Sequence, residues 1–369
     1  MDVNERACSP AGNGDRLMRL ECLRGAAALY VFLHHYVRIN LPGHEGIAAF
    51  FPFGQAAVLV FFLLSGFVIH YASLGQRPEL SFRQYFVRRA RRIFPIFLIA
   101  LLCTHVASSV YHGGWVSLPA RELLLNLLQL QDRPREGNWA GPYLGNAPLW
   151  SLSYEWWFYM LYFPIERAFE KRPSWRRGGV LGISLLGFAT DVLWPNPLAH
   201  VASYLVIWWS GVEVARQFLR EGKVTLRQQA FSVGSILLLT ALWGIMTVRE
   251  AALSPLAWQE HPGLAFRHFA TTFGLIAVGW LWYWLGLRGF DRLLGPFHRI
   301  AGFSYALYVM HLPLLWMARE LGGTGLLAFL WVAPAVLGCC WWVEKVLVPW
   351  SQRSRSKVPP VLRGEGRPA

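Results

Sequence analysis

Three apolar segments of the sequence each contain a residue that could take part in proton transfer: His35, Glu155 and His311. Ionisable groups are costly at membrane depth, so each one inside an apolar run is a candidate for function. An imidazole titrates near neutral pH and a carboxylate can orient it, which suits these groups to general acid–base chemistry. Counted along their segments, the three residues fall at similar depth, and this common depth indicates a shared site.

Two of these residues have polar neighbours on the same helical face. Arg24 precedes His35 by eleven residues, which places both on one face of a helix with a rise of about 16 Å between them. Ser304 and Tyr308 share a stripe with His311, at spacings of seven and three residues. The alternatives are an arginine that reaches the lipid headgroups and polar side chains that join neighbouring helices.

Two further motifs suit the binding of a ligand. Arg88, Arg89, Arg91 and Arg92 lie within five residues, just before an apolar segment. They could neutralise lipid headgroups, or they could clamp the phosphates of a nucleotide-bearing donor, since guanidinium forks match phosphate geometry. The pair Ser65-Gly66 lies in the middle of another apolar segment, where small residues permit either close helix packing or room for a ligand chain.

The elements that carry these residues are long apolar segments. Apolar residues make up 54% of the 369-residue chain and charged residues 15%, against about 25% charged residues in a soluble domain. A membrane-spanning helix needs about 20 mostly apolar residues. The sequence predicts ten such helices, at 23–39, 54–75, 93–111, 150–169, 178–194, 197–215, 231–248, 268–287, 300–318 and 326–348. We therefore expect an all-α polytopic membrane protein with about ten transmembrane helices.

The basic residues indicate the orientation of these segments. Lys and Arg concentrate in alternate loops, and both termini belong to the basic set, which places both in the cytoplasm. The net charge of +14 is then explained by topology, and no nucleic-acid partner is expected. We expect a polar cytoplasmic segment at 1–19, a transmembrane domain at 20–350 and a basic tail at 351–369. We expect no metal site, because the five cysteines show no zinc-binding spacing and no H-E-x-x-H motif occurs.

Five blocks of the sequence, in order, resemble the acyltransferase-3 family of integral-membrane O-acyltransferases. They are LECLRGAAALYVFLHHY (20–36), FFLLSGFVI (61–69), VRRARRIFP (87–95), PLWSLSYEWWFYMLYFP (148–164) and GFSYALYVMHLP (302–313). Glu344 also resembles a late acidic residue of the family. The chain departs from the family pattern at Glu21, which replaces an Asp, at Trp156, which replaces a frequent acidic residue, and at Val346, which replaces a Pro.

The resemblance implies a membrane O-acyltransferase of the plasma (inner) membrane. Its donor would be a cytosolic acyl-CoA, above all acetyl-CoA, and its acceptor a hydroxyl of a sugar, glycan or small hydrophobic molecule. No metal is implied. Within this reaction His35 suits the role of general base or transient acyl carrier, with support from Arg24 and with Glu155 orienting an imidazole. Acceptor identity, acyl chain length and oligomeric state stay open.

The remaining candidate residues would bind the two substrates. Tyr308 and His311 could contact the acceptor hydroxyl or the thioester oxygen, and the acyl chain could thread past Ser65-Gly66. The four arginines at 88–92 would grip the phosphates of CoA. The competing functions are a transporter or flippase, which also places polar residues inside a helical bundle, and a membrane anchor of an envelope complex.

Overall fold

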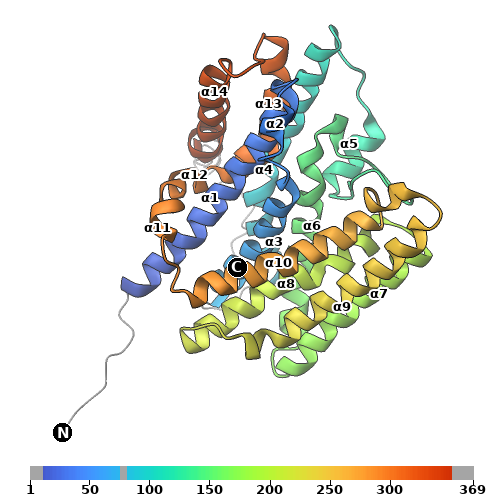
Figure 1. Cartoon of the computed structure of the whole chain (residues 1–369), viewed down its shortest axis with the longest axis vertical. Coiled ribbons are helices and arrows are strands. Elements are labelled where there is room, and N and C mark those ends of the chain that lie inside the picture. Colours follow the sequence, from blue (N-terminus) through green and yellow to red (C-terminus); the bar gives the residue numbers. More distant parts are fainter. Residues whose placement is uncertain (1–10, 75–80, 351–369) are drawn as a thin grey trace, which may run out of the picture.

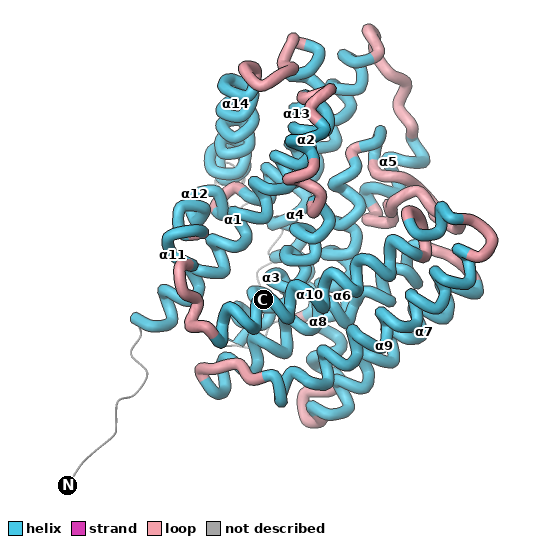
Figure 2. Tube along the Cα trace, in the orientation of Figure 1, coloured by secondary structure: helices cyan, strands magenta, loops and turns pink. Residues whose placement is uncertain are grey.

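The structure, a computed structural model, describes residues 11–74 and 81–350, and within these ranges it contains helices and no strand (Figure 2). Each of the ten predicted segments coincides with a long helix. These helices are α1 (Ala11–Asn40), α3 (Gly54–Leu74), α4 (Phe82–Tyr111), α6 (Trp150–Ala168), α7 (Pro173–Leu193), α8 (Pro197–Glu221), α9 (Leu226–Ala251), α10 (Gly263–Trp284), α13 (Ser304–Glu320) and α14 (Phe329–Trp342). Shorter helices, among them α2 (Glu45–Ala48), α5 (Ala120–Leu127), α11 (Phe290–Leu293) and α12 (His298–Ala301), lie in the connections.

Six of the described helices are long and apolar enough to cross a membrane, and a seventh span results if a helix pair bent by 76° is counted as one. This pair consists of Gly295–Ala301 and Ser304–Glu320. The chain is thus an all-helical protein with several membrane-spanning helices, as the composition indicates. The full count of ten spans and the cytoplasmic placement of both termini stay predictions. Helix α1 begins at Ala11 and so includes part of the expected polar segment 1–19, whereas residues 1–10 and the tail 351–369 lie outside the described residues.

The bundle has two parts that meet at α3 and α8. Helices α7 to α10 run along one flank, and α1, α13 and α14 lie on the other (Figure 1). Helix α8 is the most enclosed candidate span, since 83% of its apolar window is buried, against 22% in the Pro255–Trp284 span. Helix α8 therefore packs mainly against protein, whereas α10 leaves most of its surface for lipid.

Two glycines allow α3 and α8 to cross at backbone contact. A Cβ atom on Gly66 would lie 2.1 Å from the carbonyl oxygen of Trp208, and one on Gly211 would lie 2.0 Å from that of Leu63. Small residues at such crossings let two helix backbones approach closely in a membrane. The contact fixes which face of α3 is turned away from α8, and this second face carries Ser65.

Candidate active site

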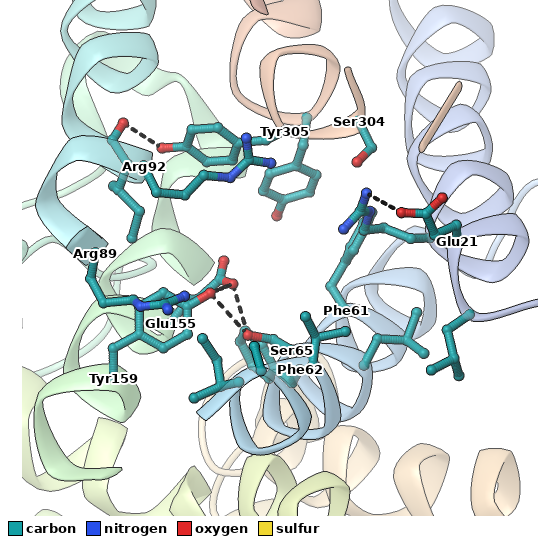
Figure 3. Close-up of a pocket in the computed structure, with 18 of the residues that line it drawn as sticks. Glu21, Phe61, Phe62, Ser65, Arg89, Arg92, Glu155, Tyr159, Ser304 and Tyr305 are labelled. Atoms are coloured by element: carbon teal, nitrogen blue, oxygen red, sulfur yellow. Dashed lines mark hydrogen bonds and ion pairs between the residues drawn. The ribbon is translucent and has the colours of Figure 1, made fainter. Parts of the chain in front are cut away.

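A cavity of about 430 Å³ opens between α1, α3, α4, α6 and α13. Figure 3 shows Arg89 and Arg92 reaching into it from one side and Glu21 facing them from the other. Its polar wall consists of Glu21, Arg24, Ser65, Tyr71, Arg89, Arg92, Ser151, Glu155, Tyr159, Ser304, Tyr305 and Tyr308. Its size lies in the range of about 300–1,000 Å³ that is usual for small-molecule sites.

The arginine cluster divides into two faces of α4. Arg89 and Arg92, three residues apart, line the cavity, whereas Arg88 and Arg91 are exposed and do not line it. Arg24 joins the two lining arginines from α1, and its Nη2 donates to the carbonyl oxygen of Ala301 at 2.9 Å. Half of the predicted phosphate clamp therefore faces the cavity, with Arg24 as an added cation.

Two of these three arginines, Arg24 and Arg89, each have a buried N–H donor without a partner in the described part of the chain. The Nε atoms of Arg24 and Arg89 are buried and have no hydrogen-bond partner among the described residues. The guanidinium of Arg89 lies over the rings of Tyr85 and Tyr159, at 5.4 and 5.8 Å from their centroids. A buried donor without a partner is costly, so this wall suits an anionic ligand that accepts from several N–H groups.

The acidic residue Glu344 fixes the position of Arg92. Its side chain is 3% exposed, and its Oε1 lies 2.9 Å from Nη1 of Arg92. Its Oε2 accepts from the backbone N–H of Ala306 at 2.8 Å, in the first turn of α13. A carboxylate at a helix N-terminus is stabilised by the unpaired N–H groups there. The sequence resemblance singled out Glu344, but its pairing with a residue 252 positions away is visible only in the fold.

Glu155 lies in this cavity and not beside the imidazoles. Its Oε1 accepts from Ser65 Oγ at 2.9 Å and from the hydroxyl of Tyr159, and these two hydroxyl oxygens are 3.0 Å apart. No hydrogen bond between Glu155 and His35 or His311 occurs in the described part of the chain. The expectation that Glu155 orients an imidazole is therefore not met in this structure, because α6 turns Glu155 toward α3. Tyr159, one turn further along α6, was missed in the sequence.

The two predicted histidines do meet. Nδ1 of His35 lies 3.1 Å from Nε2 of His311, although the residues are 276 positions apart. The Nδ1 atom of each histidine contacts a carbonyl oxygen one turn earlier in its own helix. For His35 this is the oxygen of Val31 at 3.0 Å, and for His311 it is the oxygen of Leu307 at 2.8 Å. His311 is fully buried and His35 is half-buried.

These contacts determine the tautomers of a neutral pair. A carbonyl oxygen can only accept, so Nδ1 of His311 carries its proton and Nε2 is left as an acceptor. Nδ1 of His35 then donates to both Val31 and His311. This arrangement leaves Nε2 of His35 with a free lone pair, which is the atom a general base requires.

Tyr308 separates the histidine pair from the cavity. Its hydroxyl lies 2.7 Å from Ser151 Oγ, and its ring centroid is 6.3 Å from that of His311. Tyr308 and Ser151 line the cavity, but neither histidine does. Of the predicted ligand-binding residues, Ser65 and Tyr308 reach the cavity, whereas Gly66 packs against α8. The close-packing interpretation of Gly66 is thus the one its position supports.

A second cavity, of about 390 Å³, lies on the other face of α6. Trp150 and Tyr154, four residues apart, line it, whereas Ser151, Glu155 and Tyr159 line the first cavity at the same spacing. Its wall also includes Asp132, Arg133, Arg135, His200, Tyr204, Gln259, Glu260, His261 and His268. Helix α6 is therefore a partition with one side turned to each cavity, and neither the second cavity nor its residues were predicted.

Comparisons with known proteins identify the family of this chain. The model of acyltransferase family 3, described as an acyltransferase domain, matches residues 19–345. The chain belongs to this family, which confirms the resemblance seen in its sequence blocks. It is 30% identical over 171 residues to acyltransferase MdmB of Streptomyces mycarofaciens, a match that covers 43% of this chain and 42% of that protein. No solved structure matches the chain.

Proposed function

We propose that this protein moves an acyl group, with acetyl as the first candidate, from cytosolic acyl-CoA to a hydroxyl of a sugar, glycan or small hydrophobic acceptor in the plasma (inner) membrane. The observation that carries the proposal is the His35–His311 pair, which leaves Nε2 of His35 free to take the proton of the acceptor hydroxyl. Family membership favours this enzyme over a transporter, a flippase or an anchor.

The donor would occupy the first cavity. Arg24, Arg89 and Arg92 would bind the phosphates of CoA, since all three line the cavity and the Nε atoms of Arg24 and Arg89 have no hydrogen-bond partner among the described residues. The thioester arm would then extend past Ser65 and Glu155 toward Tyr308. This direction leads to the histidine pair, which lies one aromatic ring beyond the end of the cavity.

The acceptor would occupy the second cavity. Arg133 and Arg135 line this cavity, which lies on the face of α6 opposite to the donor cavity. The two substrates would thus approach the histidine pair from the two sides of α6. The hydroxyl proton passes to Nε2 of His35, the new C–O bond forms as the C–S bond breaks, and the CoA thiolate leaves through the first cavity.

The test compares cells that express the wild-type chain, His35→Ala and no chain. Mass spectrometry of envelope glycans and metabolites should reveal one acyl increment that occurs with the wild type alone. Loss of a positioned base typically costs about 10²–10⁴ in rate. Equal membrane levels of both chains serve as the control, and normal product from a well-expressed His35→Ala variant would refute the assignment of the base.

Donor binding is tested separately, in purified protein. Arg89→Ala combined with Arg92→Ala should raise the KM for acetyl-CoA more than the KM for the acceptor, because both side chains line the donor cavity. The matched control is Arg88→Ala combined with Arg91→Ala, which removes the same charge from residues outside the cavity wall. If both double variants changed the KM for acetyl-CoA equally, the arginine cluster would serve only to orient the helices in the membrane.

A further inference from the structure

A cluster of two histidines and one aspartate lies at the second cavity, with the two histidines in its wall and the aspartate behind them. Asp191 is near the end of α7, His200 is in the first turn of α8, and His261 precedes α10. Oδ2 of Asp191 lies 2.6 Å from Nδ1 of His200 and 3.6 Å from Nε2 of His261. The three candidate ligand atoms all lie within 4.8 Å of one another. The three side chains therefore point at one common position.

The carboxylate of Asp191 is held in place by Arg135, on the side away from the two histidines. The side chain of Asp191 is fully buried, and its Oδ1 lies 3.0 Å from Nη1 of Arg135. Arg135 also pairs with Asp132 at 3.2 Å. A ligand carboxylate whose second oxygen is bound by another residue is the usual second layer of a metal site.

The histidine rings are also fixed. Trp243 packs against both, with ring centroids 5.9 Å from His200 and 5.1 Å from His261. Both histidines line the second cavity, whereas Asp191 does not. An ion held by the three side chains would therefore have protein behind it and the cavity in front of it. This is the arrangement of a site with three protein ligands and one open position.

We propose that Asp191, His200 and His261 form a binding site for a divalent transition-metal ion of the zinc type, open toward the second cavity. One carboxylate oxygen and two imidazole nitrogens are a common ligand set for Zn²⁺. Bonds of about 2.0–2.1 Å in a tetrahedron place ligand atoms about 3.3 Å apart. The Asp191–His200 contact would open by about 0.7 Å and the Asp191–His261 contact would close by about 0.3 Å, relative to the present 2.6 and 3.6 Å.

The competing interpretation is a metal-free ion-pair network in which one histidine is protonated against Asp191. Both interpretations use the same contacts, but they differ in what the histidines bind. A metal requires the neutral, unprotonated nitrogen of His200 at the position that now faces Asp191. The site would join the outer ends of α7 and α8 to the segment before α10, and this role does not depend on acyl transfer.

The experiment uses the full chain purified in detergent, stripped with EDTA and then equilibrated with ZnCl₂. Elemental analysis after removal of free ion should find about one zinc per chain in the wild type, and zinc should raise its Tm. His200→Gln and His261→Gln should each weaken zinc binding at least tenfold by calorimetry. The matched control is His268→Gln, a buried histidine of the same cavity that is outside the cluster and should retain the ion.

Two results would overturn the proposal: no zinc above the detergent blank, or zinc binding that is unchanged in both cluster variants. The first would establish the metal-free ion-pair network, and the second an adventitious ion elsewhere on the chain. If a histidine variant does not fold, Asp191→Asn replaces it, because this change keeps the shape of the side chain and removes the charged ligand. Neither of these results would contradict the acyl-transfer proposal, because that proposal is tested by mass spectrometry of the acylated product and not by zinc binding.

Discussion

The role of His311 can be separated from that of His35 by two substitutions at the same position. In the structure, Nε2 of His311 accepts the shared Nδ1 proton of His35 at 3.1 Å. His311→Gln places an amide oxygen near this point and should keep the hydrogen bond, whereas His311→Leu fills the same space and removes it. A hydrogen bond of this kind contributes about 0.5–1.5 kcal/mol, so its loss should slow acyl transfer about 2- to 13-fold.

The size of the decrease in the acyl-transfer rate distinguishes a residue that orients the base from the base itself. His35 keeps its second contact to the carbonyl oxygen of Val31, so His311→Leu should retain part of the orientation. His35→Gln should cost about 10²–10⁴. The assay measures the initial rate of label transfer from radiolabelled acetyl-CoA to the acceptor, in variants matched for Tm. If His311→Gln were as inactive as His35→Gln while still folded, His311 would itself be the base or the acyl carrier.

Two further predictions concern donor binding and packing. Glu344→Ala should raise the KM for acetyl-CoA several-fold with little change in kcat, because Arg92 loses the buried carboxylate that holds it at the cavity. An unchanged KM for acetyl-CoA would contradict this positioning role of Glu344. Gly66→Ala should lower the free energy of unfolding by about 1–3 kcal/mol, since its Cβ would lie 2.1 Å from the carbonyl oxygen of Trp208. Gly182→Ala, with nothing within 4 Å, should leave the Tm unchanged or raise it, because alanine favours a helix more than glycine does.

The ten long helices were predictable because each depends on the spacing of apolar residues along one segment. Apolar runs located all ten long helices, since backbone groups in lipid must be satisfied within the helix. The similar depth of His35 and His311 along their helices follows from the same count. The structure brings these two side chains to 3.1 Å, but it places Glu155, the third residue of the expected site, beside Ser65 and Tyr159.

The other contacts depend on how each helix is rotated about its axis, which spacing does not determine. Glu155 is turned toward Ser65 on α3 because α6 separates two cavities, and the sequence contains no signal for a second cavity. The same holds for Glu344 and Arg92, which come together across 252 positions. The i, i+4 spacing of Ser151, Glu155 and Tyr159 is the one sequence signal that could have identified the cavity face of α6.

Tyr308 has a particular position in the proposed reaction. A thioester in the first cavity would meet Tyr308 before His35, because Tyr308 lines this cavity, the histidines do not, and its ring centroid lies 6.3 Å from that of His311. The ring is buried and packs against Phe61 at 5.5 Å, so its movement would require a rearrangement of this wall as well as loss of the Ser151 contact. With the ring in its present place, the thioester would stay apart from His35, the base that could activate water. Helix α6 and Tyr308 together would therefore favour transfer to an acceptor hydroxyl over hydrolysis of the donor.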